Sequence, residues 1–291
     1  MPIAMPTYYP GIPLCAVALA LLAGCVNTPT EPAGTPRKET LHALTVNMEL
    51  LTVNAGQPRS VQKRLAVTGL PTSESLIGMD YRVARGVLFV VSRSGTVYTL
   101  DANTGVLKAL SGKPLDKPLQ GSAFGMDFNP VADRIRVVSN TGQNLRLHPD
   151  TGALAAADPA LSFVPGDAQA NFAPDVVAAG YTYNKTNDKL TTNYAIDRRN
   201  GSLLTQGTVE GVQPAVSPNT GQLSTVGLLG TGPLIDAAMD IADVSGAAFA
   251  AVRTAATPAT RLYLINLSSG QAQLLGTVGD GAPLIGIAVE P

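Results

Sequence analysis

A segment of 31 residues occurs twice in this chain, and the distance between its two copies is 47 residues. Residues 77–107 align with residues 124–154 without a gap, and eleven of the 31 aligned positions are identical. Both copies alternate apolar, β-branched runs with turns that contain Gly, Asn and Asp, which is typical of short antiparallel strands. Self-similarity at a period of about 40–50 residues, with four short strands in each copy, predicts the blades of a β-propeller.

Three more copies of the unit are incomplete or divergent. The segment at 50–56 aligns with residues 97–103 at the same offset, and weaker copies begin near Val176 and near Ala238. An additional strand-and-turn excursion covers residues 207–230. We therefore predict an all-β protein with five four-stranded blades, and a sixth blade stays open as an alternative if the excursion is the remnant of one.

The two ends of the repeat region complement each other. The first copy has no opening strand, and the last segment, Leu284–Val289, resembles the opening strand of the second copy at residues 76–81. Pairing of the last segment with a strand of the hairpin at residues 41–53 would close the ring. Closure removes the exposed sheet edges that otherwise favour aggregation.

The composition limits the chemistry that this fold can carry. Lys and Arg number 20 against 21 for Asp and Glu, a net charge of −1 that argues against nucleic acid as the main partner. Both cysteines, Cys15 and Cys25, precede residue 26, so the folded part has no disulfide, thiol nucleophile or cysteine ligand. With only two histidines, a zinc site rich in His is not expected.

The N-terminal segment has the features of an export signal. Gly11–Ala23 is an apolar run of 13 residues, too short to span a bilayer and suited to a signal peptide. It is followed by Gly24 and Cys25, and the sequence LAGC resembles a bacterial lipobox, although residues 1–10 lack the usual Lys or Arg. We expect a lipoprotein-type signal peptide at 1–25 with Cys25 as the lipidated residue, a Pro/Thr-rich tether at 26–40, and one propeller domain at 41–291. A loose apolar tail is the alternative.

The run DRIRVVSNTGQNLRLHPDTG, residues 133–152, resembles the signature of the bacterial domain of unknown function 4394 family. The repeated GMD strand and the TG turns are similar to that family as well, and the resemblance covers about residues 41–291. It implies an exported, β-propeller-like protein without an established activity. It assigns no catalytic residue, and we predict none.

Asp80, Asp127 and Asp240 occupy the same position in the opening strand of three units. Because opening strands line the central channel of a propeller, the three carboxylates could converge on a hard cation such as Ca²⁺. Alternatively, each carboxylate accepts backbone N–H groups of the neighbouring blade and fixes the blade spacing. We favour the structural role, since the other two units carry Ala or Gly there.

Four cationic or titratable side chains replace apolar and polar residues in the third unit, namely Arg134, Arg136, Arg146 and His148. The period of two along a strand places the first two on one face and the last two on one face of the next strand. They could form an anion site, or an interblade network in which acids or carbonyl groups satisfy the arginines. We favour the network, because the faces of propeller blades are mostly buried.

Three functions are compatible with these features, since propellers host many activities. The first is a binding module at the cell envelope, held to the membrane by its lipid and recognising a protein or glycan ligand. The second is an enzyme of the hydrolase or lactonase kind with a metal in the central channel, and the third is a structural envelope component. We favour the first, on the periplasmic face of the outer membrane or at the cell surface. We expect a monomer without a cofactor, with Ca²⁺ as the alternative.

Overall fold

The computed structural model describes residues 1–5, 31, 34–110, 115–116 and 118–291. The chain divides into two units, residues 1–31 and residues 32–291. In the first unit the described residues form no helix or strand. The predicted signal peptide and Cys25 lie outside the described residues. Within the described part of the chain, no helix has the length and apolar character needed to span a membrane.

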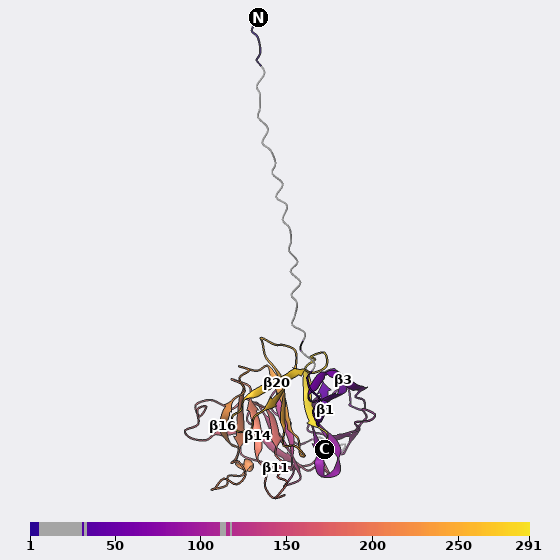
Figure 1. The fold of residues 1–291 in the computed structure, drawn as a ribbon, viewed down its shortest axis with the longest axis vertical. Helices are drawn as coiled ribbons and strands as arrows, with labels where there is room; N and C mark the ends of the chain where they lie inside the picture. The colour runs from indigo at the N-terminus through magenta and orange to yellow at the C-terminus, as the bar shows by residue number, and fades with distance from the viewer. Residues whose placement is uncertain (6–30, 32–33, 111–114, 117) are drawn as a thin grey trace. The chain divides into compact units, whose positions relative to one another are not determined.

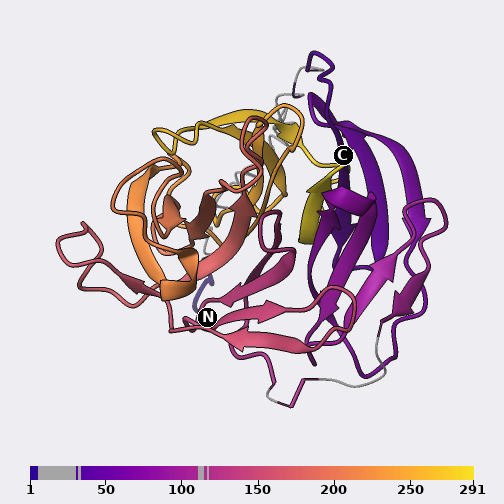
Figure 2. The ribbon, with the colours of Figure 1, turned by 90° about the horizontal axis from the view of Figure 1, so that it is seen from below.

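Residues 32–291 form a five-bladed β-propeller, which confirms the predicted fold and excludes the sixth blade (Figures 1 and 2). Each blade contains four antiparallel strands, and the innermost strands of the five sheets contact one another around the ring. These inner strands are β21 (Leu284–Val289), β4 (Leu76–Arg82), β8 (Phe124–Asn129), β13 (Val176–Tyr181) and β17 (Asp236–Ile241). The inner strands of adjacent blades therefore form the wall of the central channel.

The remaining strands follow outward from the channel in the same blade order. The second strands are β1 (Thr40–Thr45), β5 (Val87–Ser92), β9 (Arg134–Ser139), β14 (Asn193–Asp197) and β18 (Ala248–Arg253). The third strands are β2 (Glu49–Asn54), β6 (Val97–Leu100), β10 (Asn144–Leu147), β15 (Ser202–Gln206) and β19 (Arg261–Ile265). The outer strands are β3 (Gln57–Ala66), β7 (Leu107–Ala109), β11 (Leu154–Ala157), β16 (Gln222–Leu228) and β20 (Ala272–Thr277).

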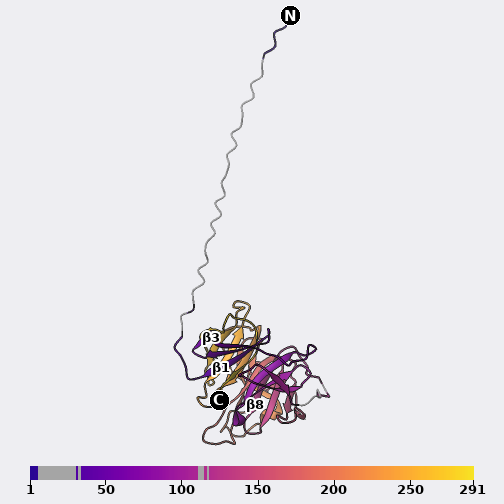
Figure 3. The same cartoon turned by 90° about the vertical axis from the view of Figure 1, so that its right-hand side faces the viewer.

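The ring closes as predicted, by pairing of the last strand with the first. Strand β21 is antiparallel to β1, with Leu41 opposite Val289 and Ala43 opposite Ile287. The yellow β21 accordingly lies beside the indigo strands of the first blade in Figure 2. Strands β1 and β8, which belong to the first and third blades, are labelled in Figure 3.

The excursion at residues 207–230 supplies β16, the outer strand of the fourth blade, and not a further blade. A short strand that the sequence did not indicate, β12 (Ser162–Phe163), adds to this sheet in parallel with β16. The described residues contain no α-helix, and two short 3₁₀ turns lie at Val83–Arg85 and Pro218–Thr220.

The core is divided among the five spaces between adjacent blades. Side chains alternate along a strand, so one strand contacts both neighbouring blades. In β5, Leu88 and Val90 pack against the first blade, whereas Phe89 and Val91 pack against the third blade. This two-sided burial explains why the sequence of β5 is an almost continuous apolar run, VLFVVS. The hairpins that join them turn at glycines with a positive φ, such as Gly95 at 85° and its repeat equivalent Gly142 at 81°.

Part of the predicted tether belongs to the folded unit. The side-chain amide of Gln57 donates to the carbonyl of Gly34 at 2.9 Å, and the backbone N–H of Arg37 donates to Asn54 Oδ1 at 2.9 Å. The segment from Gly34 to Glu39 therefore contacts the first blade. It lies inside the 26–40 range, which was assigned from composition alone.

Candidate functional site

Three buried carboxylates converge on the axis of the propeller. Asp80, Asp127 and Asp240 lie in the inner strands β4, β8 and β17, and all three are buried. One oxygen of each lies within 4.8 Å of the others. The repeat therefore brings together the three residues that the sequence placed at one position of the unit.

Each of these carboxylates also binds the inner strand of the next blade. Asp80 Oδ2 accepts the backbone N–H of Phe128 at 2.8 Å, and Asp127 accepts that of Tyr181. Asp240 Oδ2 accepts the backbone N–H of Val289 at 2.5 Å. The second oxygens of Asp80 and Asp240 accept the N–H of the residue that follows each in its own strand. These contacts favour the structural role, in which the carboxylates hold adjacent inner strands together.

The two remaining blades carry no acid at this position. Gly180 and Ala288 precede Tyr181 and Val289, just as Asp127 precedes Phe128. A calcium ion prefers about 6–8 oxygen ligands, so three carboxylates alone would leave its coordination incomplete.

Burial raises the pKa values of all three carboxyl groups, and repulsion from the other carboxylates of the cluster adds to the effect at Asp80 and Asp127. Burial is the main cause, and it raises the pKa of Asp80 and of Asp127 well above the usual value. The pKa of Asp240 is raised to about 6 by burial, opposed by the N–H groups of Val289 and Ile241. The cluster therefore retains protons at pH values where exposed carboxyl groups are ionised.

The centre of the channel is nearly filled. Gly78, Met79, Met126 and Met239 are among the residues that line it, and the free volume there is about 10 Å³, close to the minimum that one water molecule needs. A wider opening of about 270 Å³ lies where the inner strands begin, and Arg93 and Asp236 are its charged residues.

The four side chains of the predicted anion site or interblade network divide into two groups in the structure. Arg136 is fully buried, and its guanidinium donates to Tyr181 Oη at 2.6 Å and to Asn219 Oδ1 at 2.5 Å. It also contacts Asn144 and lies 3.2 Å from Asp158 Oδ2. All of these donors are satisfied by side chains of the third and fourth blades and the loops that join them, which favours the interblade network over an anion site.

Arg146 shares the same acid. Its guanidinium forms a two-bond pair with Asp158, at 2.8 Å for both contacts, and this pair raises the pKa of Arg146. Asp158 therefore bridges Arg146 and Arg136, because the two oxygens of one carboxylate can accept hydrogen bonds from two guanidinium groups.

The other two members of the predicted group lie outside this network. Arg134 donates to the carbonyl groups of Ala132 and Asp133 in its own turn. His148 Nδ1 accepts the backbone N–H of Asp150 at 3.2 Å. The shared strand face that the sequence indicated does not bring these side chains into contact with Asp158, because turn carbonyls and N–H groups satisfy them locally.

A second ion-pair network was not predicted from the sequence. Arg82, which ends the inner strand β4 and is buried, donates to Asp133 at 2.5 and 2.8 Å and to Asp150 at 2.5 Å. It therefore links the second blade to two turns of the third. A charged residue at the end of an apolar inner strand was the signal that could have revealed it.

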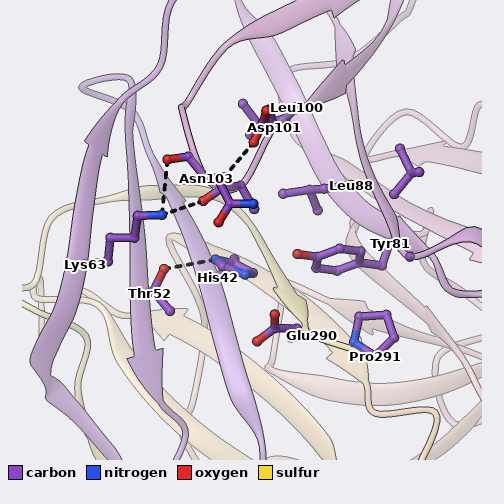
Figure 4. A pocket seen from close by; sticks show the side chains of 13 residues that line it. His42, Thr52, Lys63, Tyr81, Leu88, Leu100, Asp101, Asn103, Glu290 and Pro291 are labelled. Atoms are coloured by element: carbon purple, nitrogen blue, oxygen red, sulfur yellow. Dashed lines mark hydrogen bonds between the residues drawn. The ribbon is translucent and has the colours of Figure 1, made fainter.

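A polar pocket of about 570 Å³ lies between the first and second blades (Figure 4). Its volume is within the range of about 300–1,000 Å³ that is usual for small-molecule sites. The residues that line it are His42, Thr52, Lys63, Tyr81, Gly86, Val87, Leu88, Leu100, Asp101, Ala102, Asn103, Glu290 and Pro291. They come from β1 to β6, from the turn before β5 and from the segments that follow β6 and β21, so closure of the ring completes the pocket.

His42 is the buried polar group of this pocket. The side chain is 4% exposed, its Nδ1 lies 3.2 Å from Thr52 Oγ1, and its ring centroid lies 5.8 Å from that of Tyr81. Nε2 is buried and has no hydrogen-bond partner among the described residues. Burial lowers the pKa of His42, Glu290 opposes the effect and Lys63 adds to it, so the ring is neutral near pH 7.

This pocket was hardly predictable from the sequence. His42 stands between Leu41 and Ala43 in an apolar strand, and a polar residue at such a position is a weak signal. Its pocket partners Tyr81 and Glu290 are distant in the sequence, and only the closed ring brings them together.

The fold and its repeat define the class of protein, a five-bladed β-propeller. The chain belongs to the family described as Domain of unknown function (DUF4394), whose model matches residues 49–288. No curated protein matches the chain.

Solved structures match the chain at low sequence identity. The crystal structure of a nidogen/laminin complex matches with 12% identity and a TM-score of 0.47 over 87% of this chain and 98% of that chain. A protein of unknown function from Bacteroides thetaiotaomicron matches with 15% identity and a TM-score of 0.45, over 75% of this chain and 56% of that chain. Glutaminyl cyclase from Myxococcus xanthus matches with 11% identity and a TM-score of 0.44, over 80% of this chain and 97% of that chain. All three TM-scores are below 0.5, so the activities of these proteins carry no argument for this chain.

Proposed function

We propose that this protein is an exported, lipid-anchored binding module that holds a small polar ligand in the pocket between its first and second blades. One observation carries the proposal, namely that a pocket of about 570 Å³ is lined by His42, whose buried Nε2 has no hydrogen-bond partner among the described residues. A buried polar atom without a hydrogen bond costs about 1–3 kcal/mol, and a ligand that supplies the missing bond recovers that free energy.

The location is proposed from the N-terminal sequence. The apolar run Gly11–Ala23 and the LAGC motif that ends at Cys25 support export and lipidation. A diacylated cysteine would hold the propeller at a membrane surface, on the periplasmic face of the outer membrane or at the cell surface. We keep the expectations that the protein is a monomer and that nucleic acid is not its partner, given the net charge of −1.

The channel gives weaker support to the enzyme alternative. The oxygens of Asp80 and Asp240 accept backbone N–H groups, and the cavity at the centre of the channel is about 10 Å³. A hydrolytic metal centre needs an open coordination position and room for a substrate beside it. The pocket beside His42 has the volume that the channel lacks.

A ligand-observed NMR screen tests the binding proposal. A fragment library with apolar, polar, cationic and anionic members would be mixed with the soluble protein that begins at residue 34, which retains the described propeller. We expect polar fragments whose saturation-transfer signal is lost in His42→Phe, a change that keeps the ring and removes both nitrogens.

The matched control is His148→Phe, which alters the only other histidine of the chain, outside the pocket. It should retain every hit. A screen without hits, or hits that survive in His42→Phe, would contradict the proposal.

A further inference from the structure

We infer that the pocket between the first and second blades takes a neutral saccharide, with one sugar hydroxyl hydrogen-bonded to His42 Nε2. The inference rests on the proposed binding function and specifies the chemistry of the ligand. It follows from the hydrogen-bonding state of His42, from the charges around the pocket and from its apolar wall.

The hydrogen-bonding state of the His42 imidazole favours a hydroxyl group as its partner. In a neutral imidazole one nitrogen donates and the other accepts. The contact between Nδ1 and Thr52 Oγ1 fits either arrangement, so Nε2 is either a donor or an acceptor. A hydroxyl group complements both states, whereas a carboxylate or phosphate complements only a donor and an ammonium group only an acceptor.

The charges that line the pocket disfavour an anionic ligand. The ammonium group of Lys63 already donates to the carbonyl groups of Ala102 and Asn103, at 3.3 and 3.1 Å. The carboxylates of Asp101 and Glu290 also line the pocket, so an anionic ligand would meet more negative than positive charge. Their oxygens are good acceptors for sugar hydroxyl groups.

One wall of the pocket is apolar and suits the apolar face of a sugar. Leu88, Leu100 and the ring of Tyr81 are buried and face the pocket from the second blade (Figure 4). Sugars present one apolar face of C–H groups, which can pack on such a surface. Burial and the charge of Glu290 raise the pKa of Tyr81 to about 12, so its phenol keeps the proton that it can donate.

An amine is the strongest competitor, because Glu290 would attract it. A neutral sugar is favoured because an ammonium group near His42 would also meet Lys63. Glu290→Gln separates the two ligand types, since it removes the charge and keeps an acceptor. We expect the affinity for a neutral sugar to change by less than about threefold, and that for a cation to fall by about tenfold or more.

Isothermal titration of the residue 34–291 protein tests the inference with named probes. The neutral probes are glucose, galactose, mannose, N-acetylglucosamine, maltose and cellobiose, and the charged probes are choline and inorganic phosphate. We expect saturable binding of at least one neutral sugar, weakened about tenfold or more in His42→Phe and unchanged in His148→Phe. If His42→Phe does not fold, Tyr81→Phe replaces it and should weaken the same sugar severalfold.

The outcomes separate this inference from the proposed function. Fragment hits that depend on His42 without any binding of the six sugars would overturn the saccharide assignment and leave the binding function standing. Choline or phosphate as the only probe that depends on His42 would do the same. Absence of both fragment and sugar binding would overturn the binding function and the saccharide assignment together. Sugar binding that survives in His42→Phe would show that the sugar binds at another site.

Discussion

Asp240 Oδ2 accepts the backbone N–H of Val289 at 2.5 Å, and this bond joins the fifth blade to the strand that closes the ring. The same strand is hydrogen-bonded to β1 on its other side. Closure therefore depends on a buried carboxyl group as well as on strand pairing. Asp240 lies beside Asp80 and Asp127 and also holds the closing strand through Val289. The protonation state of Asp240 therefore affects the stability of the closed ring.

Stability should fall as the pH rises through the folded-state pKa of Asp240. That pKa is raised from 3.8 to about 6, so the folded protein binds more protons than the unfolded chain between these values. The stabilising contribution of protonated Asp240 to the free energy of unfolding is fully present below about pH 4 and is lost as the pH rises through about 6. We expect the free energy of unfolding to decrease by on the order of 3 kcal/mol across that window, measured by urea denaturation.

Asp240→Asn is the control for this titration. The amide cannot ionise, so the variant should be less stable at pH 4 and should show a flatter dependence on pH. Added Ca²⁺ tests the cation alternative in the same assay. We expect no rise of the melting temperature at pH 7.5, whereas a rise that Asp240→Asn abolishes would show that the cluster binds the ion.

Removal of the closing strand should destroy cooperative folding. A protein that ends at Leu284 lacks most of β21 and exposes the edge of β1. We expect a broad transition at lower temperature and loss of solubility, measured by calorimetry and light scattering. A truncated protein that melts like the full chain would show that closure contributes little.

Arg136→Ala should destabilise the protein by about 3–5 kcal/mol, because it leaves buried partners of the guanidinium without a donor. Arg134→Ala is the matched control, since the guanidinium of Arg134 donates to carbonyl groups of its own turn. It should change stability by less than about 0.5 kcal/mol. Normal stability of Arg136→Ala together with lost stabilisation by phosphate would favour the anion site instead.

Lipidation should depend on one of the two cysteines. We expect Cys25→Ser to move the protein from the detergent phase to the aqueous phase in Triton X-114 partition of bacterial cells that express it. Cys15→Ser changes the cysteine within the apolar run and should leave partition unchanged. Retention of Cys25→Ser in the detergent phase would exclude lipidation at this residue.

The repeat made the architecture predictable, because each blade is a local unit with the same strand and turn pattern. The equivalence of Leu284–Val289 with the opening strand of the second unit was enough to predict how the ring closes. The repeat also identified the three aspartates, since equal positions in equivalent blades face the same axis.

Features that depend on contacts between different blades were harder to predict from the sequence. Whether Arg134 and Arg136 share partners depends on Asp158, Tyr181 and the loop at Asn219, which no period relates to the hairpin. The pocket beside His42 is formed by residues at both ends of the repeat region, and its shape follows from how tightly two neighbouring blades pack.

The two histidines make one measurement a direct test of the binding site. A long-range ¹H–¹⁵N correlation spectrum of the residue 34–291 protein contains the ring signals of His42 and His148 alone. When a ligand from the fragment or sugar screens is added, we predict that the Nε2 signal of His42 shifts and that the ring signals of His148 do not. A bound ligand that leaves the His42 ring unchanged would contradict it.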